Sequence, residues 1–287
     1  MKVLFFHLIT LSLCLTSAIQ AQNWQQKVDY TIDVSLDTAQ KTLAGELVMT
    51  YHNNSPHDLE SIQMHLWNNA YKDKGSYFNL QNLASNDSKF YWADEMESGG
   101  YTELVVSQNG QELSTSHPKN NIEYIEIDLP TPLAPGQATE IHIQFTSKIP
   151  FIFSRGGWAP HFFALTQWYP KAAVYDEEGW HLFPYLEMGE YYAEFGDYIV
   201  SVEIPQGYKV GATGVQTNST AIDTSRSRYT FEAKNVLDFA WFAGANMIEE
   251  HKTTTLEDGS VVDLHYLAPR NYPLNDVKVA DSLIPQL

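Results

Sequence analysis

Residues 30–36 read YTIDVSL, with an apolar side chain at every second position. The same alternation returns in residues 141–145, which read IHIQF, and in residues 198–204, which read YIVSVEI. Successive side chains of a β-strand point to opposite faces, so a period of two predicts strands that bury one face. Shorter runs of this kind occur in residues 47–51, 125–129, 229–231 and 262–266. The pattern predicts an all-β chain built of large twisted antiparallel sheets.

Residues that favour turns separate the predicted strands. They form the sequences NNSP at 53–56, NG at 109–110, PG at 135–136, PQG at 205–207 and GATG at 211–214. The last sequence lacks the Lys-Ser or Lys-Thr pair of a phosphate-binding loop, so we expect an ordinary turn there. Residues 76–100 are polar and weakly patterned, which predicts a long surface loop. No helical periodicity of useful length appears before residue 275.

The C-terminal segment has a different pattern. Asn275 or Asp276 is a suitable cap for a helix, and apolar residues then recur along one face as far as Leu287. A free helix that ends on exposed apolar side chains buries them poorly. We therefore expect residues 269–287 to be the beginning of a helical domain that is cut short. The alternative is a short C-terminal helix docked on the sheet.

Residues 1–21 have the order of a secretory signal peptide. Lys2 precedes an apolar run at residues 3–15, and small residues up to Ala21 provide a cleavage site. The run is shorter than the roughly 20 residues that span a bilayer as a helix. We therefore expect an exported protein, periplasmic or extracellular, with no integral membrane segment after cleavage. The alternative for this segment is a buried N-terminal strand.

The single cysteine, Cys14, lies inside the predicted signal peptide. A mature chain that begins at residue 22 would then have no disulfide, no thiolate metal ligand and no cysteine nucleophile. An exported protein without disulfides depends on its hydrophobic core for stability. The mature length is sufficient for one large domain or two small ones. A Gram-negative periplasm is our first interpretation of the compartment.

Acidic residues outnumber basic residues by 35 to 17, which gives a formal net charge of −18 at pH 7. Nucleic acids and anionic membrane surfaces repel a surface of this charge. We therefore expect no nucleic-acid partner. The charge itself indicates a solubilising acidic coat and identifies no substrate.

The motifs of common hydrolases are missing from the sequence. None of the ten histidines belongs to a His-Glu-x-x-His helix, and no Gly-x-Ser-x-Gly elbow occurs. Alternation places His142 and His265 on the outward faces of their strands. We therefore expect no zinc site within this chain. The acidic residues 176–178 are conceivable as a glycosidase pair, but three adjacent acids in one loop are more often solvated.

Aromatic residues are dense between residues 151 and 198. Composition alone favours a core lined by polar-tipped rings over a wet cleft. If Trp158, Trp168 and Trp180 were exposed, they would form a stacking platform. The alternative function is then a secreted β-sandwich binding module for carbohydrate or protein.

Short motifs follow one another in a fixed order: Gly45, YHNNS at 51–55, HLWNNA at 65–70, TQWYP at 166–170, GW at 179–180, FGDY at 195–198, VEIP at 202–205, GATG at 211–214 and DFAW at 238–241. Their order and spacing resemble the N-terminal domain of zinc aminopeptidases of the aminopeptidase N family, from about residue 28 to residue 287. In that family a saddle-like β domain precedes a thermolysin-like domain that holds the zinc. The resemblance implies that residues 22–268 are the β domain and that the zinc ligands lie outside this chain.

The resemblance also implies two site residues. In the family, a loop of the β domain that reads Thr-Gln-x-Glu or Thr-Gln-x-Gln helps to hold the free amino terminus of the peptide substrate. Gln167 matches the first position, and Tyr169 departs from the pattern at the second. A phenol is neutral at pH 7, so Tyr169 cannot pair with an ammonium as a carboxylate does. The intact protein is then expected to be a zinc peptidase that uses its own C-terminal catalytic domain, and this portion alone is expected to be inactive.

Overall fold

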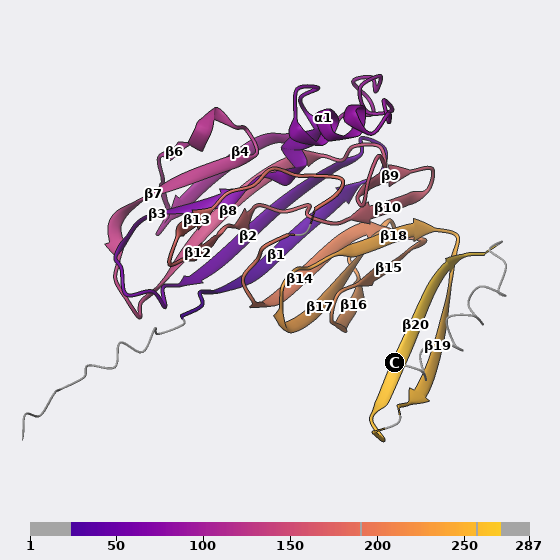
Figure 1. Cartoon of the computed structure of the whole chain (residues 1–287). Coiled ribbons are helices and arrows are strands. Elements are labelled where there is room, and N and C mark those ends of the chain that lie inside the picture. Colours follow the sequence, from indigo (N-terminus) through magenta and orange to yellow (C-terminus); the bar gives the residue numbers. More distant parts are fainter. Residues whose placement is uncertain (1–23, 190, 257, 271–287) are drawn as a thin grey trace, which may run out of the picture.

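A computed structural model describes residues 24–189, 191–256 and 258–270, and within them strands dominate (Figure 1). The all-β prediction is confirmed. The predicted signal peptide, residues 1–21, lies outside the described residues, as does all but the first two residues of the segment 269–287. Within the described ranges, no helix is long and apolar enough to cross a membrane.

The largest sheet has eight strands in the order β16-β17-β14-β1-β2-β8-β4-β5. Its strands are β1 (Lys27–Asp37), β2 (Thr42–His52), β4 (Gly100–Gln108), β5 (Gln111–Glu112), β8 (Ala138–Lys148), β14 (Gly196–Pro205), β16 (Val215–Ala221) and β17 (Arg226–Val236). Its long strands run side by side across the molecule in Figure 1. The predicted turns at 53–56, 109–110 and 135–136 fall between strands, and the turn at 205–207 begins on the last residue of β14. The turn predicted at 211–214 is shorter, because its first two residues belong to β15.

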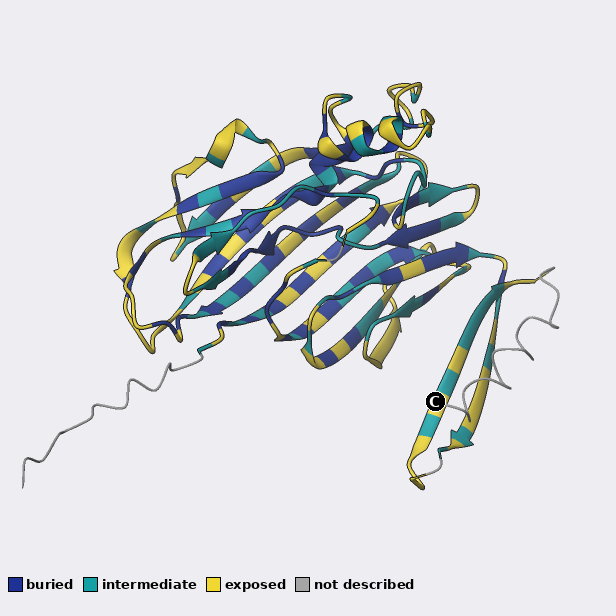
Figure 2. Ribbon diagram, in the orientation of Figure 1, coloured by how far each residue is buried: buried dark blue, intermediate teal, exposed yellow. Residues whose placement is uncertain are grey.

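Burial follows the alternation read from the sequence. In β1 the side chains of Tyr30, Ile32, Val34 and Leu36 are buried, and those between them are partly or fully exposed. The same holds for the alternating apolar residues of β8 and β14. Figure 2 shows this as bands of blue and yellow along the strands. The strand and face predictions are therefore confirmed.

One pairing in this sheet is parallel, whereas the sequence pattern predicts antiparallel sheets. Strand β1 pairs with β14 in parallel, with Tyr30 opposite Tyr198. The chain enters this pairing at Gly196, where an added Cβ would lie 1.7 Å from the carbonyl oxygen of Val28. Only glycine allows so close an approach of the two backbones. Alternation reports which face of a strand is buried and carries no information on the direction of its partner.

Smaller sheets cover the buried face of the large one. They have the orders β15-β18-β10-β9, β11-β3-β7-β6 and β12-β13. Their strands are β3 (Leu59–His65), β6 (Thr115–Ser116), β7 (Tyr124–Leu133), β9 (Gly157–Ala159), β10 (Phe162–Leu165), β11 (Lys171–Ala172), β12 (Val174–Asp176), β13 (Gly179–His181), β15 (Tyr208–Ala212) and β18 (Trp241–Ala245). Their buried side chains, among them Ile62, Phe163 and Trp241, join those of the large sheet in one core. The architecture is a β-sandwich.

A hairpin of β19 (Met247–Thr255) and β20 (Val261–Pro269) follows β18 and extends away from the sandwich (Figure 1). Its strands pair with each other in a separate two-stranded sheet. Pro269, with which the predicted helical domain begins, is the last residue of β20.

The predicted loop at residues 76–100 contains a helix, so that prediction is wrong in part. Helix α1 (Tyr77–Ala84) begins at Ser76, whose hydroxyl accepts a hydrogen bond from the backbone N–H of Asn79. The 3-10 helices η1 (Trp67–Tyr71) and η2 (Pro118–Asn120) are also present. Helix α1 and η1 contribute residues to a second hydrophobic cluster, formed by Trp67, Ala70, Tyr71, Phe78, Phe90 and Tyr185.

Candidate functional site

The segment with the predicted site residues, 166–170, connects β10 to β11. Trp168 anchors it, because the indole is buried and its Nε1 donates a 3.0 Å hydrogen bond to the carbonyl oxygen of Phe239. Just before it, Gln167 adopts φ 48°, in the left-handed region that non-glycine residues rarely occupy. Backbone strain of this kind is kept where the surrounding structure over-determines it, often at functional sites.

Tyr169 points into the protein. Its side chain is 1% exposed, and its hydroxyl lies 2.7 Å from Oδ1 of Asp238 and 3.0 Å from the hydroxyl of Tyr198. A carboxylate only accepts, so the single proton of Tyr169 goes to Asp238 and Tyr198 donates to Tyr169. Burial, together with the nearby charge of Asp238, raises the pKa of Tyr169 well above its ordinary value and keeps it neutral.

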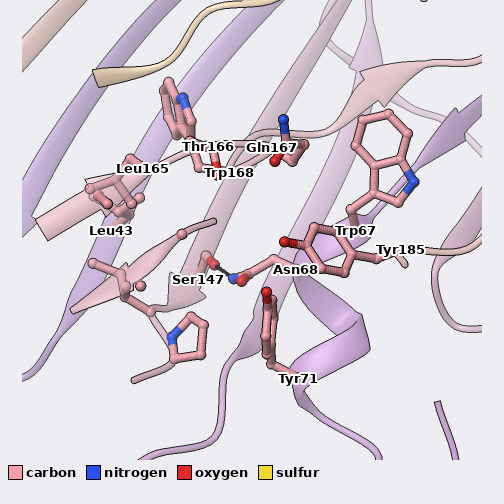
Figure 3. Close-up of a pocket in the computed structure, with 15 residues that line it drawn as sticks. Leu43, Trp67, Asn68, Tyr71, Ser147, Leu165, Thr166, Gln167, Trp168 and Tyr185 are labelled. Atoms are coloured by element: carbon pink, nitrogen blue, oxygen red, sulfur yellow. Dashed lines mark hydrogen bonds between the residues drawn. The ribbon is translucent and has the colours of Figure 1, made fainter. Parts of the chain in front are cut away.

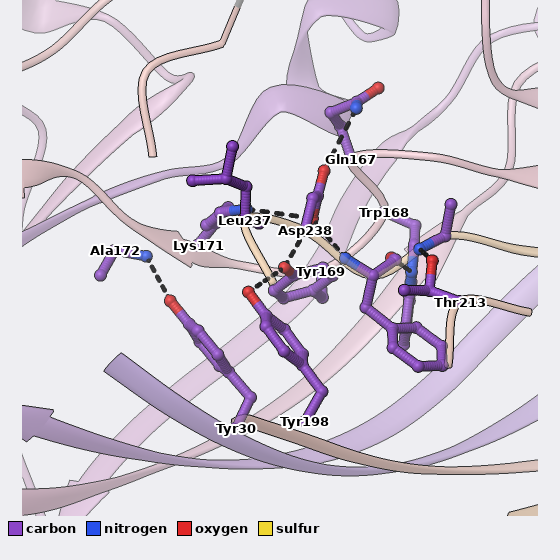
Figure 4. A network of polar contacts seen from close by, with 12 residues as sticks. Tyr30, Gln167, Trp168, Tyr169, Lys171, Ala172, Tyr198, Thr213, Leu237 and Asp238 are labelled. Carbon is purple, nitrogen blue, oxygen red and sulfur yellow. Dashed lines mark hydrogen bonds and ion pairs between the residues drawn. The ribbon is translucent and has the colours of Figure 1, made fainter. Parts of the chain in front are cut away.

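A buried lysine completes the environment of this carboxylate. The Nζ of Lys171 lies 3.1 Å from Oδ1 of Asp238 and also donates to the carbonyl oxygen of Leu237 (Figure 4). Burial lowers the pKa of Lys171, and the opposite charge of Asp238 counteracts this. The side chain of Lys171 is 3% exposed and that of Asp238 is 28% exposed, so the pair is buried on one side and open on the other.

Gln167 contacts the same carboxylate from the other side. Its Nε2 donates a 3.3 Å hydrogen bond to Oδ2 of Asp238. Its Oε1 is buried and accepts no hydrogen bond from the described residues. An unsatisfied buried oxygen costs about 1–3 kcal/mol, so a donor supplied by a water or a ligand would stabilise this atom.

The side chain of Gln167 lines a cavity of about 20 Å³ next to β10 and η1 (Figure 3). Two further buried oxygens without a partner among the described residues belong to cavity-lining side chains, the hydroxyls of Tyr71 and Thr166. On the opposite wall, the amide of Asn68 donates to Ser147 Oγ and to the carbonyl oxygen of Lys148. The volume is enough for one water-sized group.

The structure thus brings together the two predicted site residues and two that the sequence did not single out. Asp238 is the first residue of the DFAW motif and Lys171 directly follows the TQWYP motif, yet neither motif gave them a role. The available signal was the position of Lys171 directly before the apolar run 172–174, because a lysine that is buried with such a run needs an anionic partner.

The three tryptophans of the alternative binding platform do not form an exposed surface. Trp168 is 3% exposed, whereas Trp158 and Trp180 are half-buried and pack against the main core. The preference for core over cleft in residues 151–198 is confirmed for these rings. Among the acidic residues 176–178, Asp176 is bound by His181 at 2.6 Å, and the other two are exposed in the turn.

Metal ligands do not converge within the described ranges. No group of three or more His, Cys, Asp or Glu side chains there is placed to hold an ion. His142 and His265 are exposed on their strands, as predicted. His65 is buried against Trp67, and burial lowers its pKa to about 3, so it is neutral at pH 7.

No protein-family model and no curated protein matches the sequence. Solved structures of M1 zinc metallopeptidases do share the fold. A mutant of a two-domain M1 enzyme bound to L-tryptophan matches with a TM-score of 0.53 at 13% identity, over 88% of this chain and 50% of that one. A mutant M1 enzyme from Deinococcus radiodurans matches with a TM-score of 0.53 at 15% identity, over 88% of this chain and 49% of that one.

A third structure, a Deinococcus radiodurans M1 mutant bound to a Tyr-Ser-Ala substrate, has a TM-score of 0.53 at 14% identity. The match covers 87% of this chain and 49% of that one. At these identities the likeness shows a shared fold. The chain spans about half the length of the structures it matches, which fits an N-terminal domain.

Proposed function

We propose that this chain is the N-terminal β domain of an exported zinc aminopeptidase. In this proposal a catalytic domain beyond Leu287 supplies the zinc ligands, and residues 22–268 form one wall of the substrate cleft. Residues 269–287 then begin the catalytic domain. Bound zinc would activate a water for attack on the peptide bond. The observation that carries the proposal is the fold, which matches about half of each M1 zinc metallopeptidase over nearly all of this chain.

Gln167 is the substrate-contacting residue in this proposal. Its left-handed backbone and its buried Oε1, which has no partner among the described residues, support this assignment. The terminal ammonium of a peptide has three N–H donors and no acceptor, so it suits a carbonyl oxygen.

Tyr169 contributes to the same site through Asp238. With its hydroxyl engaged by Asp238 and Tyr198, it has no free proton to offer a substrate. Its role is to hold the carboxylate against which Gln167 rests. Asp238 also brings into the site the negative charge that a phenol at position 169 does not supply.

The alternative, a secreted binding module that uses aromatic stacking, is not favoured. Stacking on a sugar ring needs an exposed aromatic face, and Trp168 has none. Trp158 and Trp180 present only part of their surface.

The proposal is tested on the full-length gene product, expressed with its native N-terminus in a Gram-negative host. We expect protein recovered from the periplasm to begin at residue 22 and to hydrolyse an aminoacyl-anilide. A chelator should abolish the hydrolysis, and added zinc should restore it. Residues 22–287 alone are the matched control and should be inactive. Chelator-sensitive hydrolysis by residues 22–287, or none by the full-length protein, would contradict the proposal.

A further inference from the structure

The hydrogen bond between Gln167 and Asp238 has only one possible direction, with Gln167 as the donor. An ionised carboxylate accepts hydrogen bonds and donates none. The amide group that faces Asp238 Oδ2 is therefore the NH₂ of Gln167, at 3.3 Å. The carbonyl oxygen of the same amide is turned away from Asp238. It is buried and has no donor among the described residues.

Asp238 is itself held in one orientation. Its Oδ1 faces the hydroxyl of Tyr169 at 2.7 Å, Nζ of Lys171 at 3.1 Å and the backbone N–H of Phe239 at 2.8 Å. These three donors leave Oδ2 as the oxygen available to Gln167 (Figure 4). A carboxylate fixed by several charge-assisted bonds is a rigid reference for its neighbour. Asp238 thus orients the Gln167 amide, and the buried residues Tyr169 and Lys171 hold Asp238 in place.

The cavity beside Gln167 is chemically matched to a small donor. Besides Oε1 of Gln167, its lining residues include Tyr71 and Thr166, whose hydroxyl oxygens have no partner in the described part of the chain (Figure 3). Its volume of about 20 Å³ accommodates one water-sized group. An ammonium nitrogen is of this size and brings three donors.

We propose that Asp238 is a positioning residue that fixes the amide of Gln167 with its carbonyl oxygen presented to the terminal ammonium of the peptide. A water takes the place of the ammonium in the free protein. This inference rests on the proposed function and explains why a tyrosine can stand at position 169. The carboxylate comes from Asp238, on a segment distant in the sequence, and it orients the amide of Gln167.

The test exchanges donor and acceptor in the full-length protein. Asp238→Asn keeps an oxygen for Tyr169 and Lys171 but turns a donor toward Gln167, so the amide can flip and offer its NH₂ to the substrate. We expect KM for an aminoacyl-anilide to rise about 10-fold with kcat changed less than about 3-fold. Gln167→Glu alone places two carboxylates together and should raise KM by a similar factor.

In the double variant Asp238→Asn with Gln167→Glu, the carboxylate at position 167 again offers an acceptor to the substrate. The NH₂ group of the asparagine at position 238 then donates to that carboxylate. We expect its KM to return to within about 3-fold of the wild-type value. A purely structural role of Asp238 predicts that the two effects add, and that result would overturn the proposal. Thermal unfolding of each variant identifies one that fails to fold. Should a variant that carries Asp238→Asn fail to fold, a crystal structure of the wild-type protein decides the proposal.

A crystal structure of the full-length wild-type protein at atomic resolution tests the inference without any assay of activity. We expect Nε2 of Gln167 on Asp238 and a water within about 3 Å of Oε1 in the cavity. A dry cavity, or a carbonyl oxygen of Gln167 bonded to another protein group, would overturn the proposal. If the orientation is found and the protein lacks aminopeptidase activity, the proposed function is wrong. The assignment of the peptide's terminal ammonium as the ligand of Gln167 is then wrong as well. If the activity is present and the amide is reversed, only the inference fails.

Discussion

The hydroxyl of Tyr169 lies 2.7 Å from Oδ1 of Asp238, although the two residues are 69 positions apart in the sequence. This bond joins the segment between β10 and β11 to the segment between β17 and β18. Lys171, whose side chain is buried, forms an ion pair with the same carboxylate at 3.1 Å. The loop that holds Gln167 therefore depends on contacts made by its buried neighbours.

Removing this hydroxyl should destabilise the fold. Tyr169→Phe leaves the ring in the core and takes away a hydrogen bond to a charged group, which is worth about 1.5–3 kcal/mol. We expect the free energy of unfolding, measured by urea denaturation, to fall by that amount.

Tyr198→Phe is the matched control, because its hydroxyl donates only to the neutral hydroxyl of Tyr169 at 3.0 Å. Its loss should cost about 1 kcal/mol. Equal losses of unfolding free energy in the two variants would show that the hydrogen bond from Tyr169 to Asp238 adds no extra stability.

The left-handed backbone of Gln167 predicts an inverted ranking of glycine and alanine. At φ 48° a Cβ is strained, so Gln167→Gly should be more stable than Gln167→Ala by about 1 kcal/mol. At Thr31, an exposed position in the regular strand β1, alanine should be the more stable of the two. Chemical denaturation of the four variants measures both differences. The usual ranking at position 167 would show that its backbone is not strained.

Glu123 predicts a dependence of stability on pH. Burial raises its pKa to about 7, although its carboxylate accepts a 2.7 Å bond from the backbone N–H of Tyr185. A raised pKa means that the folded state holds the proton more tightly than the unfolded state does. The ionised carboxyl therefore costs little stability below about pH 4.5 and progressively more as the pH rises to about 7.

Glu123→Gln keeps an acceptor for Tyr185 and removes the charge. We expect it to raise the free energy of unfolding by up to about 3 kcal/mol at pH 8 and to change it little at pH 5. The exposed Glu112→Gln serves as the control and should have no such pH dependence. An effect of Glu123→Gln that is the same at both pH values would refute the burial of a charge at this position.

Zinc should bind weakly to residues 22–287. Within the described residues, the imidazoles of His251 and His265 on the β19–β20 hairpin lie side by side, with ring centroids 4.3 Å apart. Structural zinc sites have apparent binding free energies of about 10–16 kcal/mol. Calorimetric titration should show nothing of this strength, and His251→Ala should remove any weak binding. A tight site that survives His251→Ala would mean that this portion carries its own metal centre.

Most of the fold was predictable, because the information lay in short stretches. The period of two in β1, β8 and β14 determines which side chains are buried, and residues such as Ile32, Ile143 and Val200 follow it. Turn residues then separate the strands at four predicted positions.

Helix α1 was not predicted because its buried face is mostly polar. Two of its three buried residues are Asn79 and Asn82, so no apolar periodicity appears. The cap at Ser76 was a readable signal, but a single serine before an irregular stretch is weak evidence.

The candidate site was predictable only where it is local. Gln167 and Tyr169 belong to one short motif, whereas Asp238 reaches them through strand pairings of long sequence separation. The parallel pairing of β1 with β14 is of the same kind. Such contacts depend on the whole fold, and the pattern of a single stretch does not encode them.

The most direct measurement is the discrimination between a free and a blocked amino terminus by the full-length protein. We would measure kcat/KM for an aminoacyl-anilide and for its N-acetyl derivative, in the wild type and in Gln167→Ala. We predict that the wild type strongly prefers the free amine and that Gln167→Ala loses at least about 10-fold of this preference, since each tenfold is 1.4 kcal/mol. An unchanged preference in Gln167→Ala would contradict the assignment of Gln167 to the substrate amine.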